Sequence, residues 1–348
     1  MGKKAVTKII MSAIILIGAL FLLQRLLIPK YVDGVVEGAM VQEYYDTDKA
    51  FDVVFIGDCE VYENFSPMTL WDEYGINSYI RGSAEQYIFQ SYYLLEDTLS
   101  YEKPKVVVFN IQSLQFDSSR SEAYNRMSID GMRWSKSKIG SIKASMTDEE
   151  HFVEYVFPIL RFHSRWKELN AADVEYMFKN PKITFNGYYM RVDAKPAENV
   201  PKGKPLGDYS FGDNAWKYLD MMRVLCEEND IKLLFIKAPS LYPYWYPEWD
   251  EQVVEYANEH GIRYINFLDH TAETGLDYNT DTYDGGLHMN LSGAEKCAEY
   301  IGEILSKDYN VPDRRGDSGL EAKWDEVRTA YNAEIEAQRE KYGIEDGR

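Results

Sequence analysis

The chain has 348 residues, 45% of them hydrophobic and 14% aromatic, so we expect a packed fold with a sizeable core rather than disorder. Its formal net charge of −19 argues against nucleic acid as a partner, because phosphate binding needs a basic surface. The three cysteines, Cys59, Cys226 and Cys297, do not form the even, dense set of a disulfide framework. Cys226 and Cys297 lie in amphipathic segments, where we expect them to be buried as small apolar residues.

The N-terminus carries a targeting signal. Residues 9–23 contain no charged side chain, and Leu26–Ile28 extends the apolar run to about 20 residues, the length that crosses a bilayer core. Three lysines precede the run, so the positive-inside tendency predicts a single-pass cell-membrane protein with the rest of the chain outside the cytoplasm. A cleaved signal peptide is the alternative. Without a small-x-small motif after the run, we favour an uncleaved anchor over residues 1–30, followed by a linker over 31–50.

From Phe51 onward, strand-like and helix-like segments alternate. Strands are predicted at residues 51–57, 76–80, 105–111, 232–237 and 263–267. Helices are predicted at residues 66–74, 84–99, 214–229, 248–260 and 292–305. The strands are continuous apolar runs, which is typical of parallel strands buried on both faces. The sequence therefore predicts an α/β domain over residues 51–308, built on a doubly wound, five-stranded parallel sheet.

Two segments do not follow this alternation. Residues 115–206 are polar, aromatic-rich and irregular, with helical pieces at 148–157 and 171–178. We interpret them as a mostly helical insertion, placed as a cap over one edge of the sheet. Residues 309–348 form a highly charged tail, in which 320–342 predicts a helix that is either exposed or docked on the domain.

Polar residues follow the predicted strands, where open α/β sheets bind ligands. Gly57-Asp58-Cys59-Glu60 follows the first strand, and Arg81-Gly82-Ser83 follows the second. Asn110 closes the third strand and Lys237 the fourth. Asp284-Gly285-Gly286-Leu287-His288 precedes the last helix. Because the strands are parallel, these groups are expected at one edge of the sheet.

These segments resemble the conserved blocks of SGNH/GDSL hydrolases. FIGDCEVYENFSP resembles the first block, in which Gly-Asp-Ser follows the first strand, and YIRGSAEQ resembles the second. VVVFNIQSL occupies the place of the third block, and YDGGLHMNLSGAEK resembles the last. The resemblance covers about residues 51–116 and 213–305, and it implies a flavodoxin-like, three-layer SGNH sandwich. The anchor and layout look like the branch that acts in cell-envelope polymer acylation, which includes the teichoic-acid D-alanylation and alginate O-acetylation proteins.

The resemblance also implies site roles. Cys59 stands where the family has its nucleophilic serine, His288 would be the general base, and Asp284 would orient His288. The backbone of Gly82 and the side chain of Asn110 would stabilise the oxyanion. Cysteine is a competent nucleophile in this role because it can form a thioester.

Two features depart from the family pattern: cysteine replaces serine at Cys59, and the Asp before the His is shifted. Asp58 and Glu60 flank Cys59, and negative charge nearby raises the pKa of a thiol. The family places its Asp three residues before the His, where this chain has Gly285. Asp284 lies four residues before, and the two glycines could let the loop adapt. Asp281 is the alternative partner of His288.

The remaining candidates concern substrate. Arg81, His163, Arg165 and Lys237 could form a basic pocket for a carboxylate, a phosphate or sugar hydroxyls, although ion pairs on an acidic protein explain them equally well. The aromatic run at residues 241–249 could stack on sugars or could form a packed rim. The sequence contains no spaced Cys/His set and no Gly-rich nucleotide loop, so we predict neither a metal nor another cofactor.

The sequence thus leads to a functional hypothesis with an alternative. We expect an esterase or O-acyltransferase that acts, through a cysteine nucleophile, on O-acyl groups of a cell-envelope polysaccharide or related polymer. The alternative is a non-catalytic envelope protein of SGNH fold that binds glycan or assists a membrane-bound O-acyltransferase. A lipid or small-ester hydrolase held near the membrane is a third reading.

Overall fold

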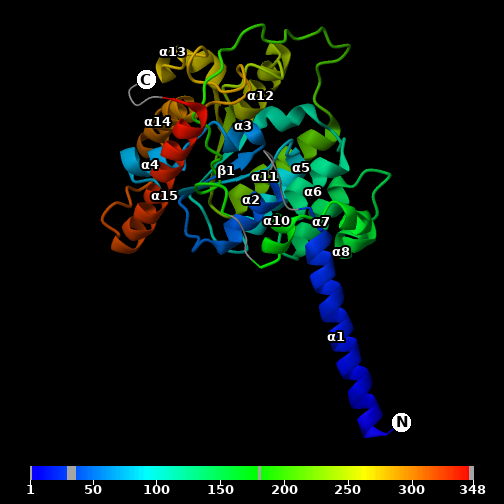
Figure 1. The fold of residues 1–348 in the computed structure, drawn as a ribbon. Helices are drawn as coiled ribbons and strands as arrows, with labels where there is room; N and C mark the ends of the chain where they lie inside the picture. The colour runs from blue at the N-terminus through cyan, green and yellow to red at the C-terminus, as the bar shows by residue number, and fades with distance from the viewer. Residues whose placement is uncertain (1, 30–36, 179–181, 345–348) are drawn as a thin grey trace.

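The computed structural model describes residues 2–29, 37–178 and 182–344, and its centre is a five-stranded sheet (Figure 1). The strands are β1 (Val53–Gly57), β2 (Ser78–Gly82), β3 (Val106–Asn110), β4 (Lys232–Lys237) and β5 (Arg263–Asn266). They pair in the order β2-β1-β3-β4-β5, and every pairing is parallel. This is the strand order of doubly wound sheets of the flavodoxin type. The predicted α/β class and the five-stranded parallel sheet are confirmed.

Alternation along the strands builds two cores. Val53 and Phe55 of β1 pack into one core with α4 (Pro67–Tyr74), α14 (Leu291–Lys307) and α15 (Ser318–Tyr342). Val54 and Ile56 pack into the other with α5 (Ile88–Thr98), α11 (Asp213–Glu228) and α12 (Pro247–His260). Because successive side chains of a strand point to opposite faces, a strand that is apolar throughout becomes the middle layer between two helical layers.

Two predicted boundaries shift for local reasons. The strand predicted from Ile76 begins at Ser78, because α4 ends at Gly75 with φ +65° and the Ile76 N–H returns to the Leu70 carbonyl at 3.1 Å. The helix predicted from Ala84 begins at Ile88. Residues 83–86 form a turn in which Glu85 has φ +46°, and the Gln90 side chain accepts from the Tyr87 N–H at 3.0 Å. Both errors lie at turns and leave the sheet register unchanged.

The N-terminal helix α1 (Lys3–Leu27) leaves the rest of the molecule from below in the view of Figure 1. It is long and apolar enough to cross a membrane, and these same properties would suit an anchor or a signal sequence. Residues 30–36, which include part of the predicted linker, lie outside the described residues. The following residues form α2 (Glu37–Glu43) and the 3-10 helix η1 (Tyr44–Asp46), whose Tyr44 and Tyr45 are buried.

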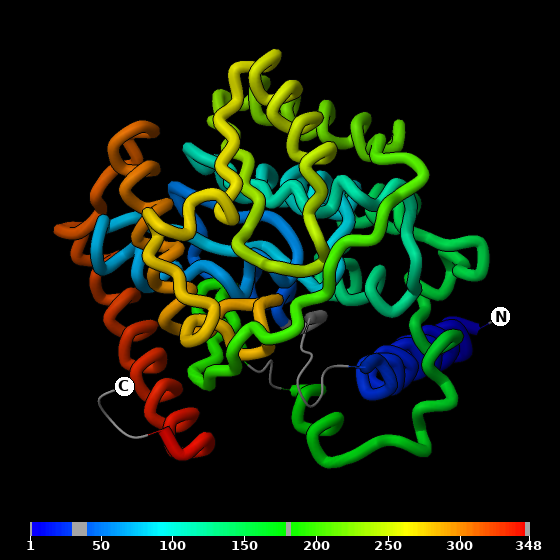
Figure 2. Tube along the Cα trace, turned by 90° about the horizontal axis from the view of Figure 1, so that it is seen from above, coloured from blue at the N-terminus to red at the C-terminus, as the bar shows by residue number. Residues whose placement is uncertain are grey.

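The segment predicted as an insertion is helical in its first two thirds. It contains α6 (Glu122–Ile129) and α7 (Lys136–Ser145), and α7 packs on α5. The shorter elements α8 (Phe152–Val156), α9 (Ile159–Phe162), η3 (His163–Lys167) and α10 (Ala171–Glu175) follow, and the last three contact α1. Residues 189–211 then run without helix or strand across the top of the sheet (Figure 2).

Short elements complete the connections between strands. They are α3 (Cys59–Tyr62) after β1, η2 (Ile111–Gln115) after β3, and η4 (Phe267–His270) with α13 (Thr271–Thr274) after β5. Each follows the carboxyl end of its strand. The polar residues at this edge therefore sit on short turns directly above the sheet.

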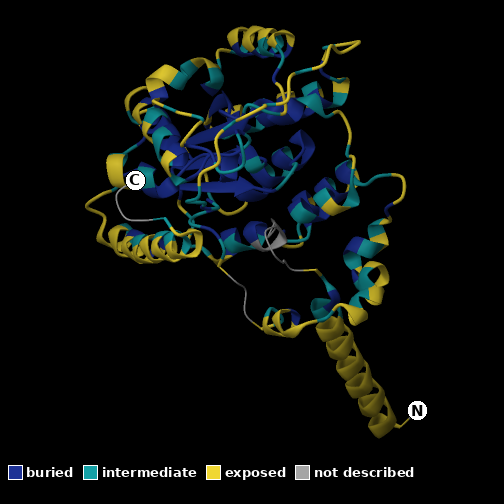
Figure 3. Cartoon of the chain, turned by 45° about the horizontal axis from the view of Figure 1, so that its top comes forward, coloured by how far each residue is buried: buried dark blue, intermediate teal, exposed yellow. Residues whose placement is uncertain are grey.

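The C-terminal helix α15 packs on the domain. Of the two alternatives for the predicted tail helix, exposed or docked, the structure shows the docked one. Its mostly exposed surface is interrupted by a buried stripe that contains Trp324 and Tyr331 (Figure 3). The Trp324 ring stacks on Trp71 with 5.2 Å between centroids, and its indole N–H donates to Asn77 at 3.1 Å. Tyr331 hydrogen-bonds Ser66, the N-cap residue of α4, at 3.1 Å.

The docking of α15 predicts a stability effect. Trp324→Ala should lower the free energy of unfolding by about 3–5 kcal/mol, because it removes a buried aromatic ring and leaves a cavity. Trp134→Ala, at an exposed tryptophan, should change it by less than about 0.5 kcal/mol. Urea denaturation of both variants measures the difference. Equal, small effects would mean that α15 does not stabilise the domain.

Candidate active site

The carboxyl end of β1 presents Cys59. Asp58 caps α3 by accepting the Glu60 backbone N–H at 3.2 Å, so Cys59 becomes the first residue of that helix. Cys59 is partly exposed, whereas Cys226 and Cys297 are buried as predicted. Gly82 lies in register with Gly57 on the neighbouring strand, and a Cβ at Gly82 would approach the Gly57 carbonyl and the Tyr62 ring to 3.0 Å each. Glycine at this position therefore allows α3 to lie close to the end of β2.

His288 reaches the same edge from the loop before α14, and Asp284 holds it. One carboxylate oxygen of Asp284 lies 2.7 Å from His288 Nδ1. The other accepts the backbone N–H groups of Leu287 at 3.1 Å and of His288 at 2.9 Å. A single carboxylate thus fixes both the ring and the loop backbone of His288.

The two glycines make this spacing possible. Gly285 and Gly286 have φ values of +92° and +105°, which disfavour other residues, and the turn they form brings Asp284 onto the ring four residues later. Asp281, the alternative partner, is engaged elsewhere. It pairs with Lys296 at 2.6 Å and accepts from Ser292 at 3.0 Å at the start of α14. Of the two carboxylates, Asp284 is therefore the one that contacts His288.

The thiol of Cys59 and the ring of His288 influence each other's protonation. Desolvation raises the pKa of Cys59 to about 11, with Asp58 and Glu63 adding to the rise while His288 opposes it. Burial alone would lower the pKa of His288, but the charges of Cys59 and Glu63 and the Asp284 hydrogen bond raise it well above its usual value. His288 Nε2 is buried without a hydrogen bond of ordinary geometry among the described residues, yet the Cys59 thiol lies close enough for a side-chain hydrogen bond with His288 to contribute to the pKa shifts of both groups. A weakly acidic thiol thus faces a strongly basic imidazole.

Sequence reasoning missed a second carboxylate beside His288. Glu63 lies one helical turn after Cys59, with an oxygen 3.8 Å from His288 Nδ1 and a hydrogen bond from the Tyr283 hydroxyl. Burial, more than the Asp284 charge, raises the pKa of Glu63. The i, i+4 spacing from Cys59 was the signal that could have identified it. Next to it, Asn64 accepts the Met289 N–H at 2.8 Å and so joins α3 to the histidine loop.

A buried polar network lies beneath the nucleophile position. Lys237 is fully buried and pairs with Glu60 at 2.9 Å. The side-chain N–H groups of Asn110 donate to Glu60 at 3.1 Å and to Asp58 at 3.2 Å, and its oxygen accepts from Ala238 at 3.2 Å. Lys237 therefore balances a buried carboxylate and does not line a substrate pocket. Asn110 lies close to Cys59, but both of its donors are already in use.

Arg81 is also an internal ion-pair residue. Its guanidinium is buried 3.1 Å from Asp97 and lies 3.9 Å from the centre of the Tyr44 ring. The structure places the side chain away from the edge that carries Cys59, because Arg81 donates from β2 to Leu94, Asp97 and Thr98 beneath α5. Successive residues of a strand face opposite sides, so Arg81 and Gly82 do not share a face. The sequence alone does not tell which of the two faces lies toward α5.

His163 and Arg165 lie apart from Cys59. Both belong to η3, which contacts the end of α1. Arg165 donates to the Leu27 carbonyl at 2.8 Å and pairs with Asp173 at 2.9 Å. In Figure 1 this region lies beside α1, whereas α3 lies above the sheet. The structure therefore does not bring the predicted basic residues together as one pocket.

A cavity of about 540 Å³ lies beside Asp284. Its other wall is residues 195–201, which are held to the histidine loop by hydrogen bonds from Lys195 N–H to the Thr282 carbonyl and from Ala197 N–H to the Tyr278 carbonyl, at 2.8 and 2.9 Å. Tyr242 lines it too. The aromatic run is thus divided, because Trp245 and Trp249 are packed in the core.

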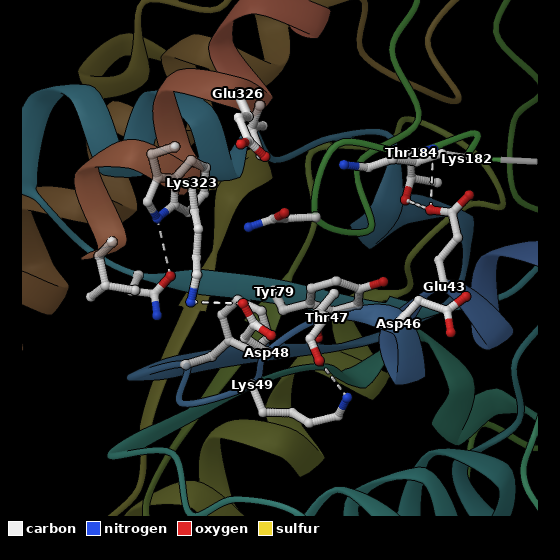
Figure 4. Close-up of a pocket in the computed structure, with 16 residues that line it drawn as sticks. Glu43, Asp46, Thr47, Asp48, Lys49, Tyr79, Lys182, Thr184, Lys323 and Glu326 are labelled. Carbon is white, nitrogen blue, oxygen red and sulfur yellow. Dashed lines mark hydrogen bonds and ion pairs between the residues drawn. The ribbon is translucent and has the colours of Figure 1, made fainter. Parts of the chain in front are cut away.

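A second cavity, of about 380 Å³, lies at the opposite edge of the sheet, between η1, residues 182–186 and α15 (Figure 4). Its lining includes three lysines and several carboxylates: Lys49, Lys182, Lys323, Glu43, Asp46, Asp48 and Glu326. Burial raises the pKa of Glu43 in its wall to about 7, against the hydrogen bonds from Thr184 and Ile183. None of the predicted site residues lines this cavity.

No protein-family model matches the chain, and no curated protein sequence matches it. Among the described residues, no group of three His, Cys, Asp or Glu side chains is arranged to hold a metal ion.

The protonation of Cys59 predicts how its labelling responds to pH. The rate of iodoacetamide labelling should rise about tenfold per pH unit from pH 6 to 9.5 without a plateau, because the thiolate is the reactive form and its pKa lies above that range. His288→Gln should slow labelling at fixed pH, and Asp58→Asn should accelerate it. Peptide mass spectrometry distinguishes Cys59 from the two buried cysteines. A plateau above pH 6 would instead indicate a preformed thiolate–imidazolium pair.

The internal position of Lys237 predicts a loss of stability. Lys237→Met should lower the free energy of unfolding by about 3–5 kcal/mol, because it leaves the Glu60 carboxylate buried without its partner. Adding Glu60→Gln should recover part of the loss. Urea denaturation measures the free energy of unfolding of both variants. An unchanged value for Lys237→Met would contradict the internal role of Lys237 and leave it as a candidate substrate contact.

Proposed function

We propose that the chain is an SGNH-like esterase or O-acyltransferase that uses Cys59 as its nucleophile and acts on O-acyl groups of a cell-envelope glycan or related polymer. The observation that carries the proposal is the convergence of Cys59 and the Asp284-bound His288 at the carboxyl edge of the sheet. They come from the first and last of the four sequence blocks that resemble the SGNH/GDSL family. In this proposal α1 anchors the protein and the site works outside the cytoplasm.

The reaction follows from the hydrogen-bonding order. His288 Nε2 takes the thiol proton as Cys59 Sγ attacks the ester carbonyl, and Asp284 stabilises the resulting imidazolium. The tetrahedral intermediate collapses, the C–O bond breaks, and Nε2 returns the proton to the leaving alkoxide. Water or an acceptor hydroxyl, deprotonated by His288, then attacks the thioester and releases the thiol. Glu63 adds a second negative charge that favours the imidazolium.

The oxyanion donors of this proposal are the backbone at Cys59 and Gly82, together with Asn110. For Asn110 to take part, one of its N–H groups must leave Asp58 or Glu60 and turn toward the oxyanion. Burial and the Glu60 charge raise the pKa of Asp58 to about 7, so protonation of Asp58 would weaken its hold on Asn110. In this proposal an N–H group of Asn110 becomes available to the oxyanion only when its hydrogen bond to Asp58 or Glu60 breaks.

The position of the site supports a polymeric substrate. The cavity beside Asp284 offers an aromatic ring, prolines and the polar side chains of Lys195, Glu198 and Asn199. Such surfaces suit sugars, which present both apolar ring faces and hydroxyls. Figures 1 and 2 show the loops around it on the side of the sheet away from α1. A substrate that extends from the membrane suits this direction better than the ester bonds of membrane lipids.

Two observations favour the non-catalytic alternative. The pKa of Cys59 is raised, and the side-chain N–H groups of Asn110 both donate to carboxylates, those of Asp58 and Glu60. A protein of this kind would hold glycan in the same cavity or assist a membrane-bound O-acyltransferase. The two proposals differ in whether a covalent bond forms at Cys59.

Kinetics with a chromogenic acetyl ester tests the enzyme proposal. The full chain in detergent should cleave the ester, and kcat/KM should increase above neutral pH as His288 loses its proton. Cys59→Ala and His288→Ala should each reduce kcat/KM by about a thousandfold or more, and Asp284→Asn by about a hundredfold or more. Cys59→Ser should retain part of the activity.

Asp281→Asn is the matched control for Asp284→Asn, because Asp281 lies in the same loop without contacting His288. It should leave kcat/KM within about twofold of the original protein. Activity that survives Cys59→Ala, or no cleavage of any acyl ester, would reject the enzyme proposal. In the second case glycan binding by the same protein would support the non-catalytic alternative.

A further inference from the structure

The segment of residues 152–178 carries an unusual concentration of exposed apolar side chains. Outside α1, fourteen large hydrophobic residues are exposed among the described residues, and six of them lie in this segment. Trp166 and Phe178 are 65% and 77% exposed. Patches of this kind mark interaction sites more often than chance exposure. We call the six residues the apolar patch: Val153, Phe157, Leu160, Trp166, Val174 and Phe178.

The apolar patch adjoins the end of α1. Helices α9 and α10 and the 3-10 helix η3 all contact α1. Arg165, between Leu160 and Val174 in the chain, donates to the Leu27 carbonyl at 2.8 Å and pairs with Asp173 of α10 at 2.9 Å. A guanidinium on the last carbonyls of a helix is favourable because the helix dipole is negative there. Arg165 therefore links the patch-bearing segment to the point where α1 ends.

The length of α1 places this point at a membrane surface. Its 25 residues span about 37 Å at 1.5 Å per residue, compared with about 30 Å for a bilayer core. If Lys3, Lys4 and Lys8 lie at one surface, Leu27 lies at the other. The residues that contact Leu27 are then at the level of the lipid headgroups, where exposed tryptophans are enriched.

We infer that the apolar patch inserts into the outer interface of the bilayer that α1 crosses. Aromatic and aliphatic side chains of the patch would enter the headgroup and upper acyl region, as in interfacial amphipathic helices. Lys167 lies over the Trp166 ring at 5.5 Å and can extend its ammonium group to the phosphates. The protein would thus be held at one helix and one surface patch.

The binding is apolar rather than electrostatic. Arg161 pairs with Glu122, and Arg165 pairs with Asp173 and Glu168, while Glu154 and Glu175 add negative charge to the same segment. With a whole-chain charge of −19, anionic lipids offer no advantage. The ligand is therefore the interface of a zwitterionic bilayer. This second attachment would fix which way the domain faces and keep the edge with Cys59 away from the lipid.

Tryptophan quenching by brominated lipid tests this inference, which does not depend on catalysis at Cys59. The full chain is reconstituted in phosphatidylcholine vesicles whose acyl chains carry bromine close to the headgroup, and only protein that floats with the vesicles is measured. Helix α1 contains no tryptophan, so quenching reports on the domain. We expect quenching in the original protein, little dependence on salt, and a clear loss of quenching in Trp166→Phe.

Reintroduced tryptophans provide the matched control. In the Trp166→Phe background, Leu160→Trp should restore quenching, because Leu160 belongs to the apolar patch. Val254→Trp should not, because this comparably exposed residue lies on α12, away from α1. Unchanged quenching in Trp166→Phe, or equal quenching at positions 160 and 254, would overturn the inference. So would an apolar patch that stays unquenched in the original protein.

Discussion

The contact between Asp284 and His288 determines what the upper edge of the sheet can do. One oxygen of Asp284 binds the imidazole and the other binds two backbone N–H groups of the loop. The hydrogen bonds that fix the ring therefore also fix the path of the chain. Without this carboxylate, a loop with two consecutive glycines at positive φ would have many conformations. Asn64 completes the arrangement by connecting this loop to the turn after Cys59.

Several carboxylates lie around Cys59, although burial and the charge of His288 act on the pKa of its thiol more strongly. Asp58, Glu60 and Glu63 surround the start of α3. Glu60 pairs with the buried Lys237, and Glu63 lies 3.8 Å from Nδ1 of His288, which is a cation when it is protonated. The hydrogen bonds from His288 hold the pKa of Asp284 below its usual range, although burial opposes this. Burial, with negative charge nearby, suppresses the free thiolate, and the same negative charge favours an imidazolium. The thiol would accordingly lose its proton during attack rather than beforehand.

Much of the fold could be predicted from the sequence, because apolar runs and helical periodicity are local signals. These signals predicted the five strands and the major helices. They also predicted that Cys226 and Cys297 are buried. The pairing of His288 with Asp284 depended on the two glycines, which the sequence displays. Side-chain direction was harder. Arg81 and Lys237 stand at strand ends, yet both turn inward to buried carboxylates, and only the three-dimensional register shows which face each residue occupies.

The position of His163 and Arg165 shows that contacts between distant segments cannot be predicted from local sequence. Their cluster of basic and aromatic residues is compatible with a substrate site, and nothing local indicates that the chain returns to the end of α1 at this point. Glu63 stands at a helical spacing from Cys59 that the sequence displays, but its contact with His288 joins two segments that are far apart in the chain. In both cases the missing information was a contact between segments distant in sequence.

The central claim is that Cys59 forms a covalent acyl intermediate with the help of His288 and Asp284. Intact-protein mass spectrometry, after rapid acid quenching of the full chain mixed with an activated acetyl ester, tests it directly. The account predicts one acetyl group, mapped by peptide analysis to Cys59, that accumulates more slowly in Asp284→Asn than in Asp281→Asn. Acetylation that is absent, or that appears on lysines at the same rate in the original protein and in His288→Gln, would contradict it.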